Sequence, residues 1–290
     1  MVTETLGFIG LGNMGAPMAA NLAAAGCDLR VHDKAGTSDR VPEGVAVAAS
    51  AAELAEAAGT VFLSLPDGNA CREVAREIAA TPGRATTVVV DFSTTGVAAA
   101  QDIARHLAEA GIAYADAPVS GGRAGAVAGT LTVMWAAPAA LLQRLRGALD
   151  AVAKHVFHVG DEPGQGQAMK LLNNFLSGTA LAATSEALAY GETQGLDPRT
   201  VIDVLNVSTG RNTATSDKFP NRILTGTFDA GFQTALMAKD LGLYVASART
   251  GGAPLEIGER VAETWRRAAR EMPDSDCTRI YEFVRGPRRA

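Results

Sequence analysis

A lysine and an asparagine stand one helical turn apart in the stretch GQGQAMKLLNN, residues 164–174. On a helix, Lys170 and Asn174 share one face, because they are four positions apart. Burial among apolar neighbours lowers the affinity of an amine for its proton, which brings its pKa towards the range that suits a general acid or base. The alternative is that Lys170 is an ordinary surface lysine, as most lysines are. The asparagines beside it weaken this alternative, because asparagine is mildly unfavourable inside a helix unless it binds something. The apolar neighbours are Ala168, Met169, Leu171 and Leu172.

A second stretch, DAPVSGG at residues 116–122, combines a hydroxyl group with two glycines. It follows an apolar run, which predicts a position at the carboxyl edge of a sheet, where ligands bind in open α/β folds. Gly121 and Gly122 can turn their amides towards an anion, so with Ser120 they form a candidate site for a carboxylate. Taken alone, the stretch favours an ordinary glycine turn. No patterned histidine or acid accompanies Ser120, so we do not expect it to act as a nucleophile.

The stretch GFIGLGNMGAPMAANL, residues 7–22, contains the pattern Gly-x-Gly-x-x-Gly. An apolar strand ends at Gly10, and the glycines then open a helix whose N-terminal amides are free. Gly10 permits a tight turn, Gly12 lets a pyrophosphate approach the backbone, and Gly15 lets helix and strand pack closely. Asp33 follows eighteen residues after Gly15, at the end of the next strand, where a carboxylate accepts hydrogen bonds from ribose hydroxyls. A lone pattern is weak, but strand, helix and acid in register predict dinucleotide binding.

The acid at the end of the second strand also bears on the choice of dinucleotide. A carboxylate at Asp33 repels a 2′-phosphate, which favours NAD over NADP. Lys34 and Arg40 lie nearby in the sequence and could bind a phosphate. The sequence therefore predicts NAD as the preferred cofactor and does not exclude NADP.

The elements that must position these residues fall into two kinds. Up to about Gly160, short apolar runs such as LGFIG, TVFLSLP and IAYADAPVS alternate with alanine-rich helical segments, which implies a mostly parallel sheet covered on both faces. After Gly160 the chain is helical in pattern, beginning with a long helix over about 165–193. The sequence predicts an α/β dinucleotide-binding domain over 1–162 and an all-α domain over 163–290, joined by the long helix.

Composition narrows the class of protein. The chain has 290 residues, 47% of them hydrophobic and 20% charged, with a net charge of −5, so nucleic acid and anionic membranes are not the expected partners. Three scattered cysteines predict neither a disulfide framework nor a metal site, and fit a reducing cytoplasm. We see no signal peptide and no run that is long and apolar enough to span a membrane.

Together these stretches resemble the β-hydroxyacid dehydrogenase family, whose best-known member is 3-hydroxyisobutyrate dehydrogenase. The family's N-terminal fingerprint, its substrate signature DAPVSGG, its Gly-x-Gly-x-x-x-Lys-x-x-x-Asn motif and its late Lys-Asp pair occur here in the same order. The resemblance covers nearly the whole chain. It implies a Rossmann-type domain followed by an all-α substrate and dimerisation domain, assembled as a homodimer or homotetramer. The implied reaction is reversible hydride transfer between NAD(P) and the C3 hydroxyl of a short β-hydroxy acid, giving a semialdehyde or ketone.

The same resemblance implies roles for the residues that act on the substrate. Lys170 would be the general acid/base, and Asn174 would orient the substrate or the lysine. The segment Ser120, Gly121 and Gly122 would hold the carboxylate end of the substrate.

Further residues follow from the family's cofactor-binding segments and from its helical domain. Phe232 and Asp240 would help to close the site around the substrate. The cofactor would contact the glycine fingerprint, the strand-end segments SLP and DFST, and a late lysine: Gly10, Leu11, Gly12, Asn13, Met14, Gly15, Asp33, Leu65, Pro66, Thr94 and Lys239.

The chain departs from the family's pattern in a few places. Arg123 directly follows the two glycines and adds a positive charge. This fits a more acidic or larger polar substrate, or a side chain that points to solvent, and we favour the second interpretation. The segment MWAA replaces a common MVGG, and Val97 replaces a common proline; neither is expected to affect the chemistry. The sequence does not choose among 3-hydroxyisobutyrate, serine, glycerate or tartronate semialdehyde, and threonate as substrate.

Three other functions compete with this interpretation. Imine reductases resemble the family but usually replace the catalytic lysine, so Lys170 counts against that activity. An oxidative decarboxylase of the 6-phosphogluconate type carries a longer helical domain than this chain has. A non-catalytic dinucleotide-binding sensor or scaffold would need neither Lys170 nor Asn174.

Overall fold

The computed structural model describes residues 4–37 and 40–286. It divides into two compact units, Met1–Lys170 and Leu171–Ala290. The first unit is an α/β structure and the second is helical. Across the described ranges, every helix is too short or too polar to cross a membrane.

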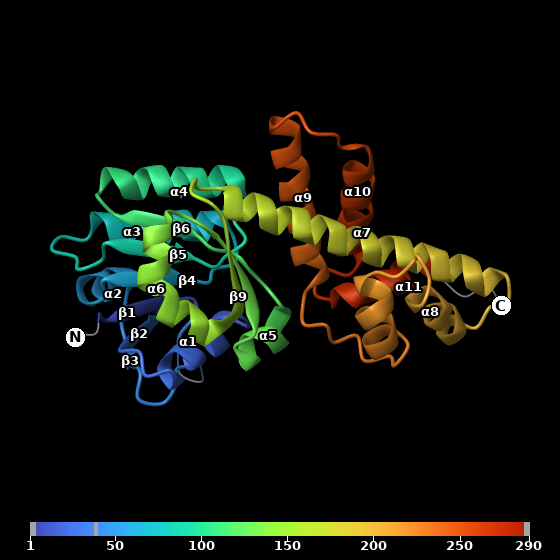
Figure 1. The fold of residues 1–290 in the computed structure, drawn as a ribbon, viewed down its shortest axis with the longest axis horizontal. Helices are drawn as coiled ribbons and strands as arrows, with labels where there is room; N and C mark the ends of the chain where they lie inside the picture. The colour runs from blue at the N-terminus through green and yellow to red at the C-terminus, as the bar shows by residue number, and fades with distance from the viewer. Residues whose placement is uncertain (1–3, 38–39, 287–290) are drawn as a thin grey trace. The chain divides into compact units, whose positions relative to one another are not determined.

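The first unit is built around a β-sheet (Figure 1). Among the described residues this sheet has nine strands. Their order is β3-β2-β1-β4-β5-β6-β8-β7, and β9 pairs with β8. Strands β1 to β6 run parallel, whereas β8 is antiparallel to β6 and β7. The chain order reverses direction on either side of β1, which is where open parallel sheets bind ligands. The strands are β1 (Leu6–Ile9), β2 (Leu29–His32), β3 (Ala46–Val47), β4 (Thr60–Leu63), β5 (Val88–Asp91), β6 (Ala113–Asp116), β7 (Val119–Ser120), β8 (Leu131–Ala136) and β9 (Ala153–Gly160).

Alternate residues of the central strands enter two separate hydrophobic cores. Phe62 of β4 belongs to one core, with its ring stacked on Phe92 at a centroid distance of 5.4 Å, while its neighbours Val61 and Leu63 belong to the other. This alternation follows from the two-residue period of a strand, and it explains why the runs are apolar throughout. The helices that cover the two faces are α1 (Gly15–Ala24), α2 (Ala51–Ala57), α3 (Gly68–Ala80), α4 (Val97–Glu109), α5 (Gly122–Ala128) and α6 (Ala139–Val152).

The apolar run IAYADAPVS forms two strands rather than one. Strand β6 ends at Asp116, and Pro118 interrupts the ladder because proline has no N–H to donate. The carbonyl of Pro118 still accepts a hydrogen bond from Met134 N at 3.0 Å, and the chain then joins the antiparallel pair of β7 with β8. The segment Ser120–Gly122 therefore starts at the end of a short antiparallel strand beside the parallel sheet and leads into α5.

The second unit has its own hydrophobic core around Trp265, which is fully buried. Gly178 does not break the long helix. Its missing Cβ lets α9 approach closely, since a Cβ there would lie 3.2 Å from Met237 Sδ. Trp265 Nε1 donates to the carbonyl of Gly178 at 3.1 Å. The helices are α7 (Gln165–Thr193), which begins in the first unit, α8 (Pro198–Asn206), the π-helix η1 (Ala214–Ile223), α9 (Thr234–Thr250), α10 (Glu256–Glu271), the 3₁₀ turn η2 (Cys277–Arg279) and α11 (Ile280–Arg285).

A buried carboxylate at the end of β6 fixes the first turn of α7. Asp116 Oδ2 accepts hydrogen bonds from the backbone N–H groups of Gly164, at 3.0 Å, and Gln167, at 2.9 Å. The side-chain Nε2 of Gln167 donates to Asp116 Oδ1 at 2.8 Å. A Cβ on Gly166 would lie 2.7 Å from the carbonyl oxygen of Met134, so the helix approaches the sheet as closely as glycine allows.

Burial raises the pKa of Asp116 to about 7, although the N–H groups of Gln167 and Gly164 lower it. A carboxyl group with a raised pKa binds its proton more tightly in the folded state than in the unfolded state. Its stabilising contribution is complete below an unfolded pKa of about 4 and is lost as the pH rises through neutrality. We expect the free energy of unfolding, taken relative to Asp116→Asn, to fall by up to about 1.4 kcal/mol per pH unit between about pH 5 and 7.

Urea unfolding followed by circular dichroism, with both proteins measured across this range, tests the prediction. Asp91 is a second buried carboxylate whose pKa burial also raises, and it is present in both proteins. The difference therefore reports Asp116 and its coupling to Asp91. A relative stability that stays flat or rises with pH would contradict the expectation.

Candidate active site

The glycine loop that follows β1 has the geometry of an anion-binding turn. Gly10 has a φ of +97°, and a Cβ there would overlap the carbonyl oxygen of Ser64. A Cβ on Gly15 would overlap the carbonyl oxygen of Gly10, so α1 packs directly on the turn. A Cβ on Gly12 would meet nothing within 4 Å, which leaves open space beside the backbone. The structure has the tight turn at Gly10 and the close packing at Gly15, while the approach of a pyrophosphate at Gly12 stays a prediction.

The loop also offers donors. Within the described ranges, the backbone N–H groups of Gly12, Asn13 and Met14 have no protein acceptor, and they precede the ten-residue helix α1. Donors of this kind at a helix N-terminus suit a pyrophosphate. The side chain of Leu11 is fully buried in the core, so only its backbone is available to a cofactor.

Asp33 holds the glycine loop through hydrogen bonds. Its Oδ2 accepts from Leu11 N at 2.6 Å, and its Oδ1 accepts from Ala35 N at 2.8 Å. Arg40 forms an ion pair with the same Oδ2 at 3.4 Å and donates to the carbonyl of Leu11 at 3.1 Å. Asp33, which is predicted to bind the ribose hydroxyls, thus also orders the loop that would hold the phosphates. The positive charge of Arg40 lies beside it.

The loops after β4 and β5 lie side by side because those strands are adjacent. Leu65 N donates to Ser93 Oγ at 2.8 Å, which ties the two loops together. Thr94, a predicted cofactor contact, is half-buried, and Pro66 is exposed. These residues follow the carboxyl ends of parallel strands, at the same edge of the sheet as the glycine loop.

The segment Ser120–Gly122 requires its glycines. Gly121 and Gly122 have φ values of +130° and +62°, which side-chain-bearing residues rarely adopt. Ser120 is half-buried at the end of β7. Arg123 is exposed, and it has no ion pair with any residue that the structure describes.

The apolar residues next to Lys170 in the sequence differ in their exposure. Lys170 is half-buried, and Leu171 is 1% exposed, but Met169 is 37% and Leu172 is 45% exposed. Successive helical residues point about 100° apart, so neighbours in sequence need not surround a side chain in space. The lowered pKa of Lys170 stays a prediction.

The second unit brings together two motifs that the sequence treated separately. Asn174 Nδ2 donates to Asp240 Oδ2 at 2.6 Å, and Lys239 Nζ lies 3.3 Å from Asp240 Oδ1. Asn174 and Asp240 are both buried, while Lys239 is partly exposed. Phe232 packs against the core of this unit, and its carbonyl accepts from Cys277 N at 2.8 Å.

Sequence reasoning missed Gln167 and the pairing of Asn174 with Asp240. The apolar period of α9 places Asp240 on the buried face with Met237 and Leu241, a position where a charged residue needs a partner. That signal was present in the sequence. The identity of the partner was not, since it lies on another helix.

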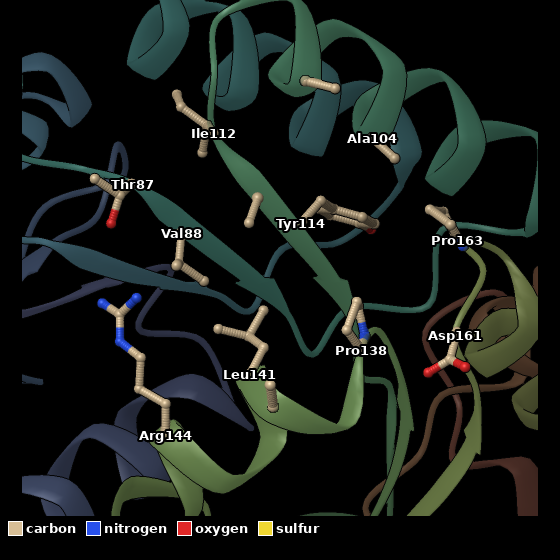
Figure 2. Close-up of a pocket in the computed structure, with 13 residues that line it drawn as sticks. Thr87, Val88, Ala104, Ile112, Tyr114, Pro138, Leu141, Arg144, Asp161 and Pro163 are labelled. Carbon is tan, nitrogen blue, oxygen red and sulfur yellow. The ribbon is translucent and has the colours of Figure 1, made fainter.

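A cavity of about 610 Å³ lies away from these residues in the first unit. Figure 2 shows it beside β6, with walls that include Tyr114, Leu141 and Arg144. None of the residues predicted to contact substrate or cofactor lines it. Over residues 4–37 and 40–286, no group of His, Cys, Asp or Glu side chains is arranged to hold a metal ion.

Two family models match consecutive parts of the chain. A model described as the NAD binding domain of 6-phosphogluconate dehydrogenase matches residues 5–160. A model described as NAD-binding of NADP-dependent 3-hydroxyisobutyrate dehydrogenase matches residues 164–284. Domains of the NAD(P)-binding kind therefore account for most of the sequence.

Similar proteins match over most of their own length. The 2-(hydroxymethyl)glutarate dehydrogenase of Eubacterium barkeri is 38% identical, over 87% of this chain and 85% of its own. The 3-hydroxyisobutyrate dehydrogenase of Pseudomonas aeruginosa is 37% identical, over 97% and 98%. The solved structure of Mycobacterium tuberculosis 3-hydroxyisobutyrate dehydrogenase with L-serine is 33% identical and has a TM-score of 0.89, covering 98% of this chain and 100% of that one.

The matches confirm the predicted fold, a Rossmann-like parallel sheet with helices followed by a helical C-terminal part that begins with α7. They cover both parts of the chain, including the glycine loop and the motif around Lys170. The chain belongs to the β-hydroxyacid dehydrogenase family and is an NAD(P)-dependent oxidoreductase of that family.

Proposed function

We propose that the protein oxidises the C3 hydroxyl of a short β-hydroxy acid reversibly, with Lys170 as general acid/base. The observation that carries the proposal is the attachment of α7: its first turn is bonded to Asp116, at the carboxyl end of β6. That is the edge of the sheet where the glycine loop lies. Lys170, in the second turn of this helix, belongs to the same unit as the proposed dinucleotide site.

In the proposed reaction the cofactor transfers the hydride and the protein transfers the proton. A bound nicotinamide dinucleotide supplies the hydride acceptor or donor. Lys170 takes the proton of the C3 hydroxyl during oxidation and returns it during reduction. Ser120 and the N–H groups of Gly121 and Gly122 are proposed to hold the carboxylate, and Asn174 to orient the substrate or the lysine.

The remaining proposed contacts follow the family's arrangement. Lys239 is proposed to reach the cofactor, and Phe232 and Asp240 to help close the site. The backbone of the loop from Gly10 to Gly15, with Leu65, Pro66 and Thr94, is proposed to contact the dinucleotide. Two observations support these cofactor contacts. The backbone N–H groups after β1 have no acceptor among the described residues, and the loops after β4 and β5 are hydrogen-bonded to each other.

The names of the similar proteins support a substrate class. The compounds in those names, 2-(hydroxymethyl)glutarate, 3-hydroxyisobutyrate and L-serine, share a hydroxymethyl group on the carbon next to a carboxylate. They differ in what else that carbon carries, and only the first has a second carboxylate. We propose that this chain also takes an acid with the shared fragment. Arg123, exposed beside Gly122, makes a second carboxylate worth including among the compounds tested.

Turnover of a panel of these acids tests the proposed function. We expect NADH formation with at least one acid, and we expect Lys170→Ala to lower kcat by about 10² to 10⁴-fold, the usual contribution of a general acid or base. Absorbance at the nicotinamide band measures the rate, and quenching of protein fluorescence measures NADH binding. NADH binding should survive the substitution, because the glycine loop is untouched.

Lys154→Ala is the matched control, since Lys154 is an exposed lysine of the same unit. It should leave kcat unchanged. A Lys170→Ala protein that turns over the same acid at the wild-type rate would rule out the proposed role. A wild type that binds NADH but oxidises no acid would favour the non-catalytic sensor, and one that reduces imines instead would favour the imine reductase.

We further propose that NAD is the preferred cofactor and that Arg40 sets how strongly NADP is rejected. Asp33 would accept the ribose hydroxyls of NAD and repel a 2′-phosphate. Arg40, 3.4 Å from that carboxylate, offsets part of its charge and could contact a phosphate. The pair therefore supports a preference for NAD that is moderate rather than absolute.

Substitution of Arg40 tests this assignment. We expect Arg40→Ala to raise the ratio of kcat/KM for NAD to that for NADP by about tenfold, the value of one charge-assisted hydrogen bond. Lys34→Ala should leave the ratio unchanged, because Lys34 is 95% exposed and pairs with Glu73 at 4.0 Å. Equal losses with both cofactors would mean that Arg40 acts only by holding the loop at Leu11.

A further inference from the structure

Gln167 connects three segments of the first unit through a fully bonded side chain. It is 0% exposed. Its Oε1 accepts hydrogen bonds from Thr95 N at 2.8 Å and Gly96 N at 3.1 Å. Its Nε2 donates to the carbonyl of Ser93 at 3.0 Å and to Asp116 Oδ1 at 2.8 Å. The segments joined are the loop at residues 93–96, the end of β6 and the first turn of α7.

The four hydrogen-bond partners of Gln167 require a side-chain amide of this length. Its oxygen faces two N–H donors and its nitrogen faces two acceptors. A flipped amide would set its NH₂ group against the donors and its oxygen against the acceptors. A glutamate in place of Gln167 would lose both donors and put a second carboxylate against Asp116. An apolar side chain of equal volume would leave four buried groups without partners, each at a cost of about 1–3 kcal/mol.

The bonded loop and the bonded helix turn each carry a proposed site residue. Thr94 lies between Ser93 and Thr95, whose backbone groups both bond to Gln167. Lys170 follows Gln167 by three positions, about one helical turn. Any shift of the first turn of α7 against the loop would therefore move the amine relative to the strand-end loop.

We propose that Gln167 is a positioning residue of the dehydrogenase reaction: it fixes the register between the 93–96 loop and the first turn of α7, and thereby the place of the Lys170 amine. The proposal rests on the proposed function, because Gln167 acts through Lys170. A displacement of about 1 Å in a reacting group can cost about 10²-fold in rate. The effect of losing Gln167 should therefore fall on kcat, with little effect on dinucleotide binding at the glycine loop.

Gln167→Met is the first variant, because it keeps the volume and removes all four side-chain hydrogen bonds. We expect kcat to fall by about 10- to 100-fold, while the Kd for NADH changes little. Gln165→Met is the matched control: Gln165 lies on the same turn but is exposed, and its Oε1 accepts only from Glu162 N, at 3.0 Å, among the described residues. It should keep the wild-type kcat.

Gln167→Glu provides a second readout and replaces Gln167→Met if that protein does not fold. It keeps the acceptor for Thr95 N and Gly96 N, and on protonation it regains one O–H donor for Ser93 or Asp116. The charged groups that face it are Asp116 and, behind it, Asp91. We expect its kcat relative to wild type to be low at about pH 8 and to rise as the pH falls, since protonation restores a donor.

The outcomes separate this proposal from the proposed function. If Lys170→Ala abolishes turnover but a folded Gln167→Met keeps kcat within about twofold, the proposed function stands and Gln167 is only a structural contact. A loss confined to NADH affinity, or a Gln167→Glu kcat equal to wild type at about pH 8, would likewise overturn the positioning role. If Lys170→Ala leaves turnover intact, the proposed function itself fails.

Discussion

The need to satisfy one buried carboxylate organises the functional edge of the first unit. Asp116 ends β6 inside the protein, where an unpaired charge would cost several kcal/mol or more. All of its described hydrogen bonds come from Gly164 and Gln167. The donors that satisfy the buried carboxylate therefore belong to the start of α7. The helix that carries Lys170 is thereby attached to the end of a sheet strand. Burial raises the pKa of Asp116 to about 7 although these hydrogen bonds lower it, so the attachment of this helix is coupled to pH.

The parallel sheet supplies the second constraint. Because β1, β2, β4, β5 and β6 run in one direction, the loops that follow them emerge at one edge. Local bonds then lock neighbouring loops together: Leu11 to Asp33 after β1 and β2, and Leu65 to Ser93 after β4 and β5. The loops at this edge are therefore held to one another rather than independent. This is the property that a dinucleotide site needs, since ordering loops on binding would cost affinity.

The sequence was sufficient where a feature depends on local pattern. The three glycines, the acid after β2 and the 165–193 helix follow from spacing and period, and the structure has them at those residues. Contacts between distant residues could not be read in this way. Gln167 and Ser93 are 74 positions apart, and Asn174 and Asp240 are 66 apart, so no local period links them. Sequence neighbours likewise do not reveal what surrounds Lys170, because a helix turns them to different sides.

The bond between Asn174 and Asp240 restricts what the asparagine can do. Asp240 accepts from Nδ2, so the amide is oriented with its nitrogen towards the acid and its oxygen away from it. That oxygen accepts from Asn173 Nδ2 at 3.1 Å, and a carbonyl oxygen has room for a second donor. Any further partner of this oxygen must therefore carry a hydrogen to donate, as a substrate hydroxyl or a lysine ammonium does. Lys239 Nζ, 3.3 Å from Asp240 Oδ1, places a positive charge beside the acid that accepts from the amide. The orienting role proposed for Asn174 is thus one of acceptor, and it depends on an acid on another helix.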